Sequence, residues 1–224
     1  MVQRSYGEAC GLAHALEVVG ERWALLIVRD LLVGPRRYTE LRKGLPRIPT
    51  NILSSRLKDL ELSGVVRRRL LPRPSSAVVY ELTEYGADLE EAVVALGRWG
   101  ARLGTQPRPG DVVTPDSLVM ALRSVFRPEA AAGPDVGYEL RVDGAVVHAR
   151  VAGGALTAAP GPLPGADLVI ETGPALGALL HGTLTPTDAI TGGAVRLTGD
   201  PALLDRFTGL FRIPPPAPRP RTGA

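Results

Sequence analysis

Short amphipathic segments that end at glycine or proline dominate the first 104 residues, and they restrict this part of the chain to small helices. Apolar residues recur with helical spacing over residues 12–19 and 23–31, and two further helices are expected at residues 38–43 and 49–63. Gly34 and Pro35 end the second pattern and Gly64 ends the fourth, because glycine after a last turn and proline beyond it are common stop signals. The chain is therefore expected to begin with four short helices.

Two β-type runs follow these helices. They cover residues 65–71 and 77–82, and the proline and serine turn between them has hairpin length. Thr83 can then cap one long helix, along which Leu89, Val93, Leu96 and Leu103 form an apolar stripe. Four helices, a hairpin and a long helix are the element order of a winged helix-turn-helix domain.

A second domain is expected after a break that is rich in proline and glycine. The chain has 224 residues, more than a typical single domain, and its 45% hydrophobic and 22% charged residues are globular proportions. The stretch GTQPRPGD, residues 104–111, cannot continue a helix. We expect a domain over residues 1–104, a linker over 105–113, a second domain over 114–213 and an extended, disordered proline-rich tail over 214–224.

The second half alternates strand and helix patterns. Thr114 and Pro115 form a helix start, and Asp143 with Gly144 separates two strand patterns as a type I′ hairpin turn does. Three further strands are expected at residues 155–158, 167–172 and 194–198, and helices at residues 174–181, 186–190 and 201–211. These patterns predict an α+β domain built around an antiparallel sheet, so the whole chain falls in the α+β class.

Charge and cysteine content restrict the partners and the compartment. The net charge is +3, and residues 1–104 hold 16 Lys or Arg against 12 Asp or Glu, so the positive excess lies in the first half. The longest apolar stretches are far shorter than the roughly 18 to 20 residues that cross a bilayer, and the amino terminus has no apolar signal segment. One cysteine cannot form an internal disulfide. We expect a cytoplasmic protein that has no membrane partner.

A polar helix face and a basic hairpin indicate DNA binding. In the helix expected at residues 49–63, leucines centre one face, and small polar side chains near the helix start lie on the other. Such side chains can reach base edges and phosphates in a major groove, although a solvated helix face is the alternative interpretation. Strand alternation places Arg67 and Arg69 on one side of the hairpin and Arg68 on the other, so not all three can face DNA. The candidate DNA contacts are Arg36, Arg37, Thr50, Asn51, Ser54, Ser55, Lys58, Arg68, Arg69 and Arg73.

A series of motifs runs in order through the same segment: Cys10, GERW from Gly20, LLIVRDLLVGPRRYTEL from Leu25, LPRIPTNILSSRLKDLELSGVVRR from Leu45, VYELTEYGADL from Val79, and Trp99 with Gly100. With these motifs the first 104 residues resemble the HxlR family of winged-helix transcriptional regulators. The chain has Glu21 and Arg22 where the family usually has glycine and lysine before the tryptophan. At the start of the 49–63 helix it has Pro49, Thr50 and Asn51 instead of the usual proline and lysine. Because the second difference lies on the expected recognition helix, the operator sequence of the family need not apply to this chain. DNA binding itself is still expected.

The resemblance implies a homodimer that pairs through its terminal helices and binds an inverted repeat in double-stranded DNA. The stripe from Leu89 to Leu103 agrees, because it extends beyond what a small winged domain can cover. Half-sites are expected about one helical turn, roughly 10 base pairs, apart. Cys10 stands where some family members carry a cysteine that senses oxidants or electrophiles. We favour a simpler interpretation, a small buried apolar residue at a helix start.

The chain carries no clustered catalytic pattern. His14, His148 and His181 are widely spaced, and no metal-ligand spacing, nucleophile elbow or phosphate loop is present. The SxxK sequence from Ser55 to Lys58 lacks its KTG companion and lies on the expected recognition helix. We therefore expect no enzyme activity, no cofactor and no metal site.

Short motifs also run in a consistent order through residues 114–212: VGYELRVDGAVVHARV, ADLVIETG, LLHGTLTPTDAITGG and AVRLTGDPALLDRFTGLF. With these motifs the second half resembles the sterol carrier protein domain family. The resemblance implies a sheet with helices that enclose an apolar tunnel for fatty-acyl or other hydrophobic ligands. Apolar stripes of this kind are more often simply core. The candidate ligand contacts are Leu118, Leu122, Phe126, Leu176, Leu179, Leu180 and Phe211.

Together the two halves predict a sequence-specific DNA-binding transcriptional regulator, modulated by a hydrophobic small molecule with different affinity for DNA-competent and incompetent dimers. One alternative is a carrier of hydrophobic ligands that uses its winged domain only for dimerisation or partner contact. The other is a thiol-based redox sensor that acts through Cys10. If the protein is a DNA-binding regulator, its affinity for DNA should fall steeply as salt rises. A carrier of hydrophobic ligands should not show this dependence.

Overall fold

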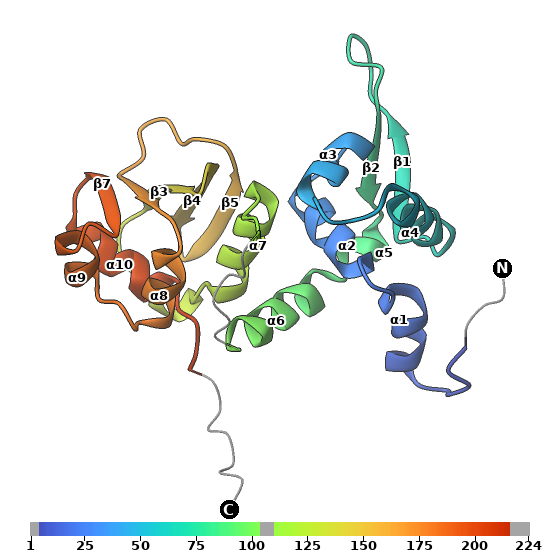
Figure 1. Cartoon of the computed structure of the whole chain (residues 1–224), viewed down its shortest axis with the longest axis horizontal. Coiled ribbons are helices and arrows are strands. Elements are labelled where there is room, and N and C mark those ends of the chain that lie inside the picture. Colours follow the sequence, from blue (N-terminus) through green and yellow to red (C-terminus); the bar gives the residue numbers. More distant parts are fainter. Residues whose placement is uncertain (1–4, 104–109, 216–224) are drawn as a thin grey trace, which may run out of the picture. The chain divides into compact units, whose positions relative to one another are not determined.

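The computed structural model describes residues 5–103 and 110–215, and the chain divides into two compact units, Met1–Val93 and Val94–Ala224. The division falls within helix α6 (Glu90–Ala101; Figure 1), before the predicted linker, most of which lies outside the described residues. Most of the predicted tail lies outside them as well. The end of α6 belongs to the second unit because Arg98 Nε donates a hydrogen bond to the Ser124 carbonyl at 2.8 Å.

The first unit has the predicted order of four helices and a hairpin. Its elements are α1 (Gly11–Val19), α2 (Ala24–Val33), α3 (Tyr38–Gly44), α4 (Thr50–Leu62), β1 (Val66–Leu70), β2 (Val78–Leu82), α5 (Glu84–Ala87) and the start of α6. Ile27 of α2, Leu41 of α3 and Leu53 of α4 are fully buried in one core. The glycine stop after α2 is confirmed, since Gly34 has a φ of 149°.

The predicted long helix after the hairpin is wrong, because the chain forms two helices there. Thr83 caps α5 by accepting a hydrogen bond from the Gly86 backbone N–H at 3.0 Å, and a turn at residues 88–89 then separates α5 from α6. Leu89 and Val93 pack against the core of the first unit, whereas the side chains of Leu96 and Leu103 are exposed. The helix begins anew after this turn, and the four residues differ in burial, so they do not form one continuous stripe.

The hairpin of the first unit is extended by the segment before α3. Strands β1 and β2 pair antiparallel, with Arg68 opposite Tyr80. The Arg36 N–H donates to the Tyr80 carbonyl at 2.9 Å, and the Tyr80 N–H donates to the Arg36 carbonyl at 2.8 Å. This bridge joins the start of α3 to the hairpin, which projects beyond the helices of its unit in Figure 1.

The second unit is built on a five-stranded sheet. Its elements are α7 (Pro115–Val125), the single turn η1 (Pro128–Ala130), β3 (Val136–Val142), β4 (Ala145–Ala152), β5 (Ala155–Pro160), β6 (Leu168–Thr172), α8 (Ala175–His181), α9 (Pro186–Thr191), β7 (Val195–Gly199) and α10 (Ala202–Leu210). Thr114 caps α7 as predicted, and the β3–β4 turn has positive φ at Asp143 (49°) and Gly144 (86°), as a type I′ turn requires.

The predicted antiparallel sheet is wrong in one pairing. The strand order is β5-β4-β3-β6-β7, and β3 pairs parallel with β6, so the sheet is mixed. The reason is the segment 161–167, which leads from one edge of the β3–β4–β5 meander to the far side of β3. There, the Leu163 N–H donates to Glu139 Oε2 at 2.8 Å. This segment starts β6 in the same direction as β3.

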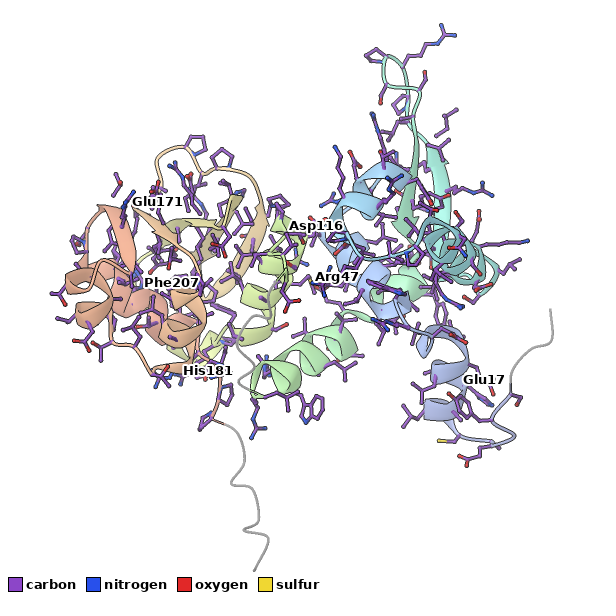
Figure 2. All side chains as sticks on the ribbon, viewed as in Figure 1. Glu17, Arg47, Asp116, Glu171, His181 and Phe207 are labelled. Carbon is purple, nitrogen blue, oxygen red and sulfur yellow. The ribbon has the colours of Figure 1, made fainter. Side chains whose placement is uncertain are left out.

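Side chains of β3 alternate between an apolar and a polar face of the sheet. Tyr138 and Leu140 are fully buried, and the Tyr138 ring meets Phe207 of α10 edge-on, with 5.2 Å between ring centroids. Figure 2 shows Phe207 within the body of this unit. On the other face, Glu139 is buried and forms a 2.7 Å ion pair with Arg141. The contact with Phe207 therefore places α10 on the apolar face, and α7 packs on β4 and β5.

Among the described residues, no helix is both long and apolar enough to cross a membrane.

Candidate nucleic-acid interface

Helix α4 presents a polar face to solvent. Leu53, Leu57 and Leu60 are at most 2% exposed, which fixes the opposite side of the helix as its free surface. The candidate DNA contacts on this helix are all exposed; they are Thr50, Asn51, Ser54, Ser55 and Lys58. The predicted division of the helix into a buried leucine face and an exposed polar face is confirmed.

Tyr38 fixes the start of α4 against α3. Its hydroxyl donates to the Thr50 carbonyl at 2.9 Å and lies 3.2 Å from Ser54 Oγ. The Ser54 hydroxyl is therefore positioned by a neighbouring side chain. Sequence reasoning missed Tyr38; the available signal was a polar aromatic residue at the first position of the helix that precedes the polar helix.

Two carboxylates position the arginines of the hairpin. Glu81 of β2 accepts hydrogen bonds from Arg67 Nε at 2.8 Å and from Arg69 Nε at 2.7 Å, while Arg68 Nε donates to Glu61 Oε1 of α4 at 2.9 Å. The predicted placement of Arg67 and Arg69 on one side and Arg68 on the other is confirmed. The hydrogen bond from Arg69, against the opposing effect of burial, leaves the pKa of Glu81 below its ordinary value.

Arg36 and Arg37 connect the start of α3 to the hairpin. The Arg37 guanidinium donates to Ser75 Oγ in the hairpin turn at 2.9 Å, and the Arg37 backbone N–H donates to Glu40 Oε2 at 2.6 Å. Arg73 is exposed in the same turn. The candidate DNA contacts thus come from the start of α3, from α4 and from the hairpin, all within the first unit (Figure 1).

The expected burial of Cys10 is wrong. The thiol is exposed at the residue before α1. Its pKa lies below the ordinary value because the backbone N–H groups of Ala13 and Leu12, at the start of the helix, stabilise the thiolate. The apolar residues of α1 do not enclose this position, because Leu12 is itself 68% exposed.

The candidate ligand residues of the second unit lie in or beside its core. Six are buried, namely Leu118, Leu122, Leu176, Leu179, Leu180 and Phe211. Phe126 is half-buried, and its ring lies 5.7 Å from that of Phe211 between centroids. In the described residues, no group of three or more His, Cys, Asp or Glu side chains is arranged to hold a metal ion.

An exposed polar helix beside a basic hairpin, in a unit that begins with four helices, defines a winged helix-turn-helix DNA-binding protein. Residues 18–107 match the family model described as HxlR-like helix-turn-helix. The HTH-type transcriptional regulator YodB of Bacillus subtilis is 35% identical over 102 residues, which cover 46% of this chain and 88% of YodB. The uncharacterized regulator YvaP of the same organism is 38% identical over 85 residues, covering 38% and 79% of the two chains. The chain belongs to the HxlR family of DNA-binding transcriptional regulators, as the motifs of its first half predicted.

Two solved structures give weaker similarities. The reduced form of YodB from Bacillus subtilis is 33% identical and covers 46% of this chain and 100% of its own, with a TM-score of 0.39. The sec-alkylsulfatase Pisa1 from Pseudomonas sp. is 27% identical and covers 45% of this chain and 16% of its own, with a TM-score of 0.41. Both TM-scores are below 0.5, so the family assignment rests on the sequence relatives. The sterol carrier resemblance of the second half stays a prediction.

Proposed function

We propose that this chain is a homodimeric transcriptional regulator that binds an inverted repeat in double-stranded DNA and that has no enzyme activity. The exposed polar face of α4, next to the arginines of the hairpin, is the observation that carries the proposal. In this proposal the exposed Asn51 and Ser55 contact base edges, and Lys58 and the hairpin arginines contact phosphates. Thr50, Ser54, Arg36 and Arg37 border this surface.

Exposed apolar side chains on two helices support the homodimer. Leu12 of α1 is 68% exposed, and Leu96 and Trp99 of α6 are 51% and 62% exposed. None of the residues of α6 is buried. Exposed apolar side chains on the free side of an amphipathic helix need a partner surface, and a second copy supplies the same surface in return.

The second unit supplies the proposed site for a hydrophobic small molecule. A sterol-carrier-like unit would bind this molecule near the candidate residues, of which Phe126 is the half-buried one. The ligand would shift DNA binding only if its affinity differed between the DNA-competent and incompetent states of the dimer. Constant operator affinity in the presence of a bound ligand would contradict this part of the proposal.

Selection of binding sites from a randomised duplex pool by the full-length protein tests the DNA-binding function. We expect an inverted repeat whose half-site centres lie about 10 base pairs apart. On the selected site, Lys58→Ala is expected to lower the slope of log K against log salt by about 1, because it removes a phosphate contact. Asn51→Ala is expected to cost about 1–3 kcal/mol at one base position.

The outcome also separates the regulator from the carrier alternative. Selected sites without symmetry would contradict the dimeric mode of binding. If the pool yields no site, and binding to DNA does not depend on salt, a carrier of hydrophobic ligands that uses the winged unit only for dimerisation becomes the better description.

A thiol-based redox sensor is the second candidate, and the exposure of Cys10 favours it. The lowered pKa of the thiol predicts that its alkylation by iodoacetamide reaches half its maximal rate at a lower pH than in the urea-unfolded chain. Treatment with hydrogen peroxide is expected to change operator affinity in the wild type, reversibly with dithiothreitol, and to leave Cys10→Ser unaffected. An equal response of both proteins, or no response in the wild type, would exclude sensing through Cys10.

A further inference from the structure

A pocket of about 300 Å³ opens where α7 ends, and all of its lining residues belong to the second unit. Its size is at the lower end of the range for small-molecule sites, about 300–1,000 Å³, so it suits a compact ligand. Val125 and Phe126 contribute apolar surface, and the Phe126 ring packs on Phe211, which belongs to the core. One wall of the pocket is therefore apolar and packs on the core of the second unit.

Three arginines from separate segments surround this apolar side. Arg98 comes from α6, Arg127 follows α7, and Arg212 follows α10. Backbone hydrogen bonds hold the last two segments together, since the Arg212 N–H donates to the Val125 carbonyl at 3.0 Å and the Arg127 N–H to the Leu210 carbonyl at 2.8 Å. Arg127 and Arg212 are therefore brought to the pocket by backbone pairing between the ends of α7 and α10.

The positive charge at the pocket is only partly neutralised. Among the described residues that line it, Glu129 is the one carboxylate, and it accepts a 2.9 Å hydrogen bond from Arg127 Nε. Arg98 uses its Nε on the Ser124 carbonyl, which orients the guanidinium and leaves its terminal nitrogens for another acceptor. Within the described part of the chain, the Arg212 side chain has no hydrogen-bond or ion-pair partner. Three guanidinium groups against one carboxylate favour an anion beside the apolar surface.

We propose that this pocket binds a small organic monocarboxylate, whose carboxylate group lies among Arg98, Arg127 and Arg212 and whose apolar body lies against Val125 and Phe126. The inference rests on the proposed function and deepens it, because it gives the hydrophobic effector an acidic group. A neutral apolar molecule would leave the guanidinium groups without a new partner, and an anion without an apolar body would leave Phe126 in water.

The position of Arg98 supplies a route to the DNA-binding unit. Arg98 lies on the same continuous helix, α6, as Val93, whose side chain packs against the core of the winged unit. A ligand carboxylate that pairs with Arg98 therefore contacts a helix that begins in the first unit and ends in the second. Ligand binding and operator affinity are expected to be coupled through this helix, and the coupling must be reciprocal.

Calorimetric titration of the full-length protein, without DNA, tests the pocket. The probes are phenylacetate and hexanoate, compared with phenylacetamide, which lacks the charge, and acetate, which lacks the apolar body. We expect phenylacetate or hexanoate to bind at least about tenfold more tightly than either comparison compound. Absence of binding by both acids, or equal binding of phenylacetate and its amide, would overturn the proposal.

Charge-neutral variants locate the site. Arg212→Gln is expected to weaken binding of the acid at least about tenfold, and Glu129→Gln to strengthen it, because it removes the competing carboxylate. Arg150→Gln is the matched control, since Arg150 is an exposed arginine on β4 of the same unit and lies outside the pocket. Equal weakening by Arg150→Gln and Arg212→Gln would overturn the assignment.

A second measurement separates this inference from the proposed function. Thermal unfolding checks that each variant is folded, and Arg98→Gln provides a further test from a different segment. If phenylacetate binds in an Arg212-dependent manner but leaves operator affinity unchanged, the pocket stands and ligand control of DNA binding is contradicted. If it binds and shifts operator affinity in the wild type but not in Arg212→Gln, both are supported.

Discussion

At the scale of single residues, carboxylates determine how the hairpin presents its basic side chains. Glu81 is only 9% exposed, yet it keeps two guanidinium groups at hydrogen-bond distance on one side of the hairpin. These groups are 65% and 44% exposed, so they retain N–H donors that can turn to phosphates. Glu61 does the same for Arg68 on the other side. The two carboxylates therefore orient the hairpin arginines within the chain itself.

Glu81→Gln tests the role of this carboxylate. The pKa of Glu81 is lowered in the folded chain, so its ion pairs stabilise the protein above the unfolded pKa, and this stabilisation is lost as pH falls through the folded pKa. At pH 7 the variant is expected to lose about 1 kcal/mol of unfolding free energy, a small value because both arginines are solvated. Urea titrations at several pH values measure this difference.

The difference between wild type and Glu81→Gln should shrink as pH falls below about 4.3, the ordinary pKa of a glutamate. A difference that stays constant from pH 7 to pH 3 would show that Glu81 acts through packing and not through its charge. Glu84→Gln is a suitable control, because Glu84 is an exposed glutamate close in sequence.

At the scale of elements, the end of α6 belongs to the second unit because it packs closely on α7. Gly97 of α6 lies against Ser124 of α7, and a Cβ atom at Gly97 would lie 2.5 Å from Ser124 Oγ. Ser124 is buried, and its hydroxyl donates to the Met120 carbonyl at 2.8 Å, so it has little freedom to move. Only glycine at position 97 lets α6 pack this closely on α7.

Gly97→Ala and Gly100→Ala form a matched pair on this helix. The first is expected to lower the free energy of unfolding by about 1–3 kcal/mol, because the new methyl group overpacks the contact with Ser124. The second is expected to raise it by roughly 0.5–1 kcal/mol, because alanine favours the helix and nothing lies within 4 Å of its Cβ. Equal effects in chemical denaturation would show that α6 and α7 are not packed in this way.

At the scale of the whole molecule, the proposed homodimer rests on side chains that one chain leaves in water. Tyr6, Leu12, Leu96, Trp99 and Leu103 are between 51% and 68% exposed, and they lie on α1, on α6 or next to them in sequence. A second copy would bury these side chains and hold two α4 helices at a fixed separation. The spacing of operator half-sites then follows from the dimer.

Trp99→Glu tests the proposed homodimer. A buried carboxylate without a partner opposes dimer formation, so the variant is expected to sediment as a monomer at concentrations where the wild type is a dimer. Its operator affinity should fall at least about tenfold, since one half-site contact is lost. Ile190→Glu is the control, because Ile190 is 41% exposed on α9, away from these helices in sequence. A dimeric Trp99→Glu would place the interface elsewhere.

Features that depend on neighbours along the chain could be predicted without the fold. Periodic leucines determined the buried face of α4, Thr114 determined the start of α7, and Asp143 with Gly144 determined the first turn of the sheet. Each signal acts within a few residues, where backbone preferences, capping and amphipathic spacing are strongest. The same local logic identified the polar face of α4 as the candidate DNA surface.

Other features were decided by packing between distant segments. Local patterns could not place β6 parallel to β3, because strand partners depend on the route of residues 161–167 across the sheet. They could not show that α1 leaves Cys10 in solvent or that Glu81 serves two arginines. Arg98, Arg127 and Arg212 meet only because α6, α7 and the end of α10 pack together, and such contacts at long sequence separation exist only once the tertiary structure has formed.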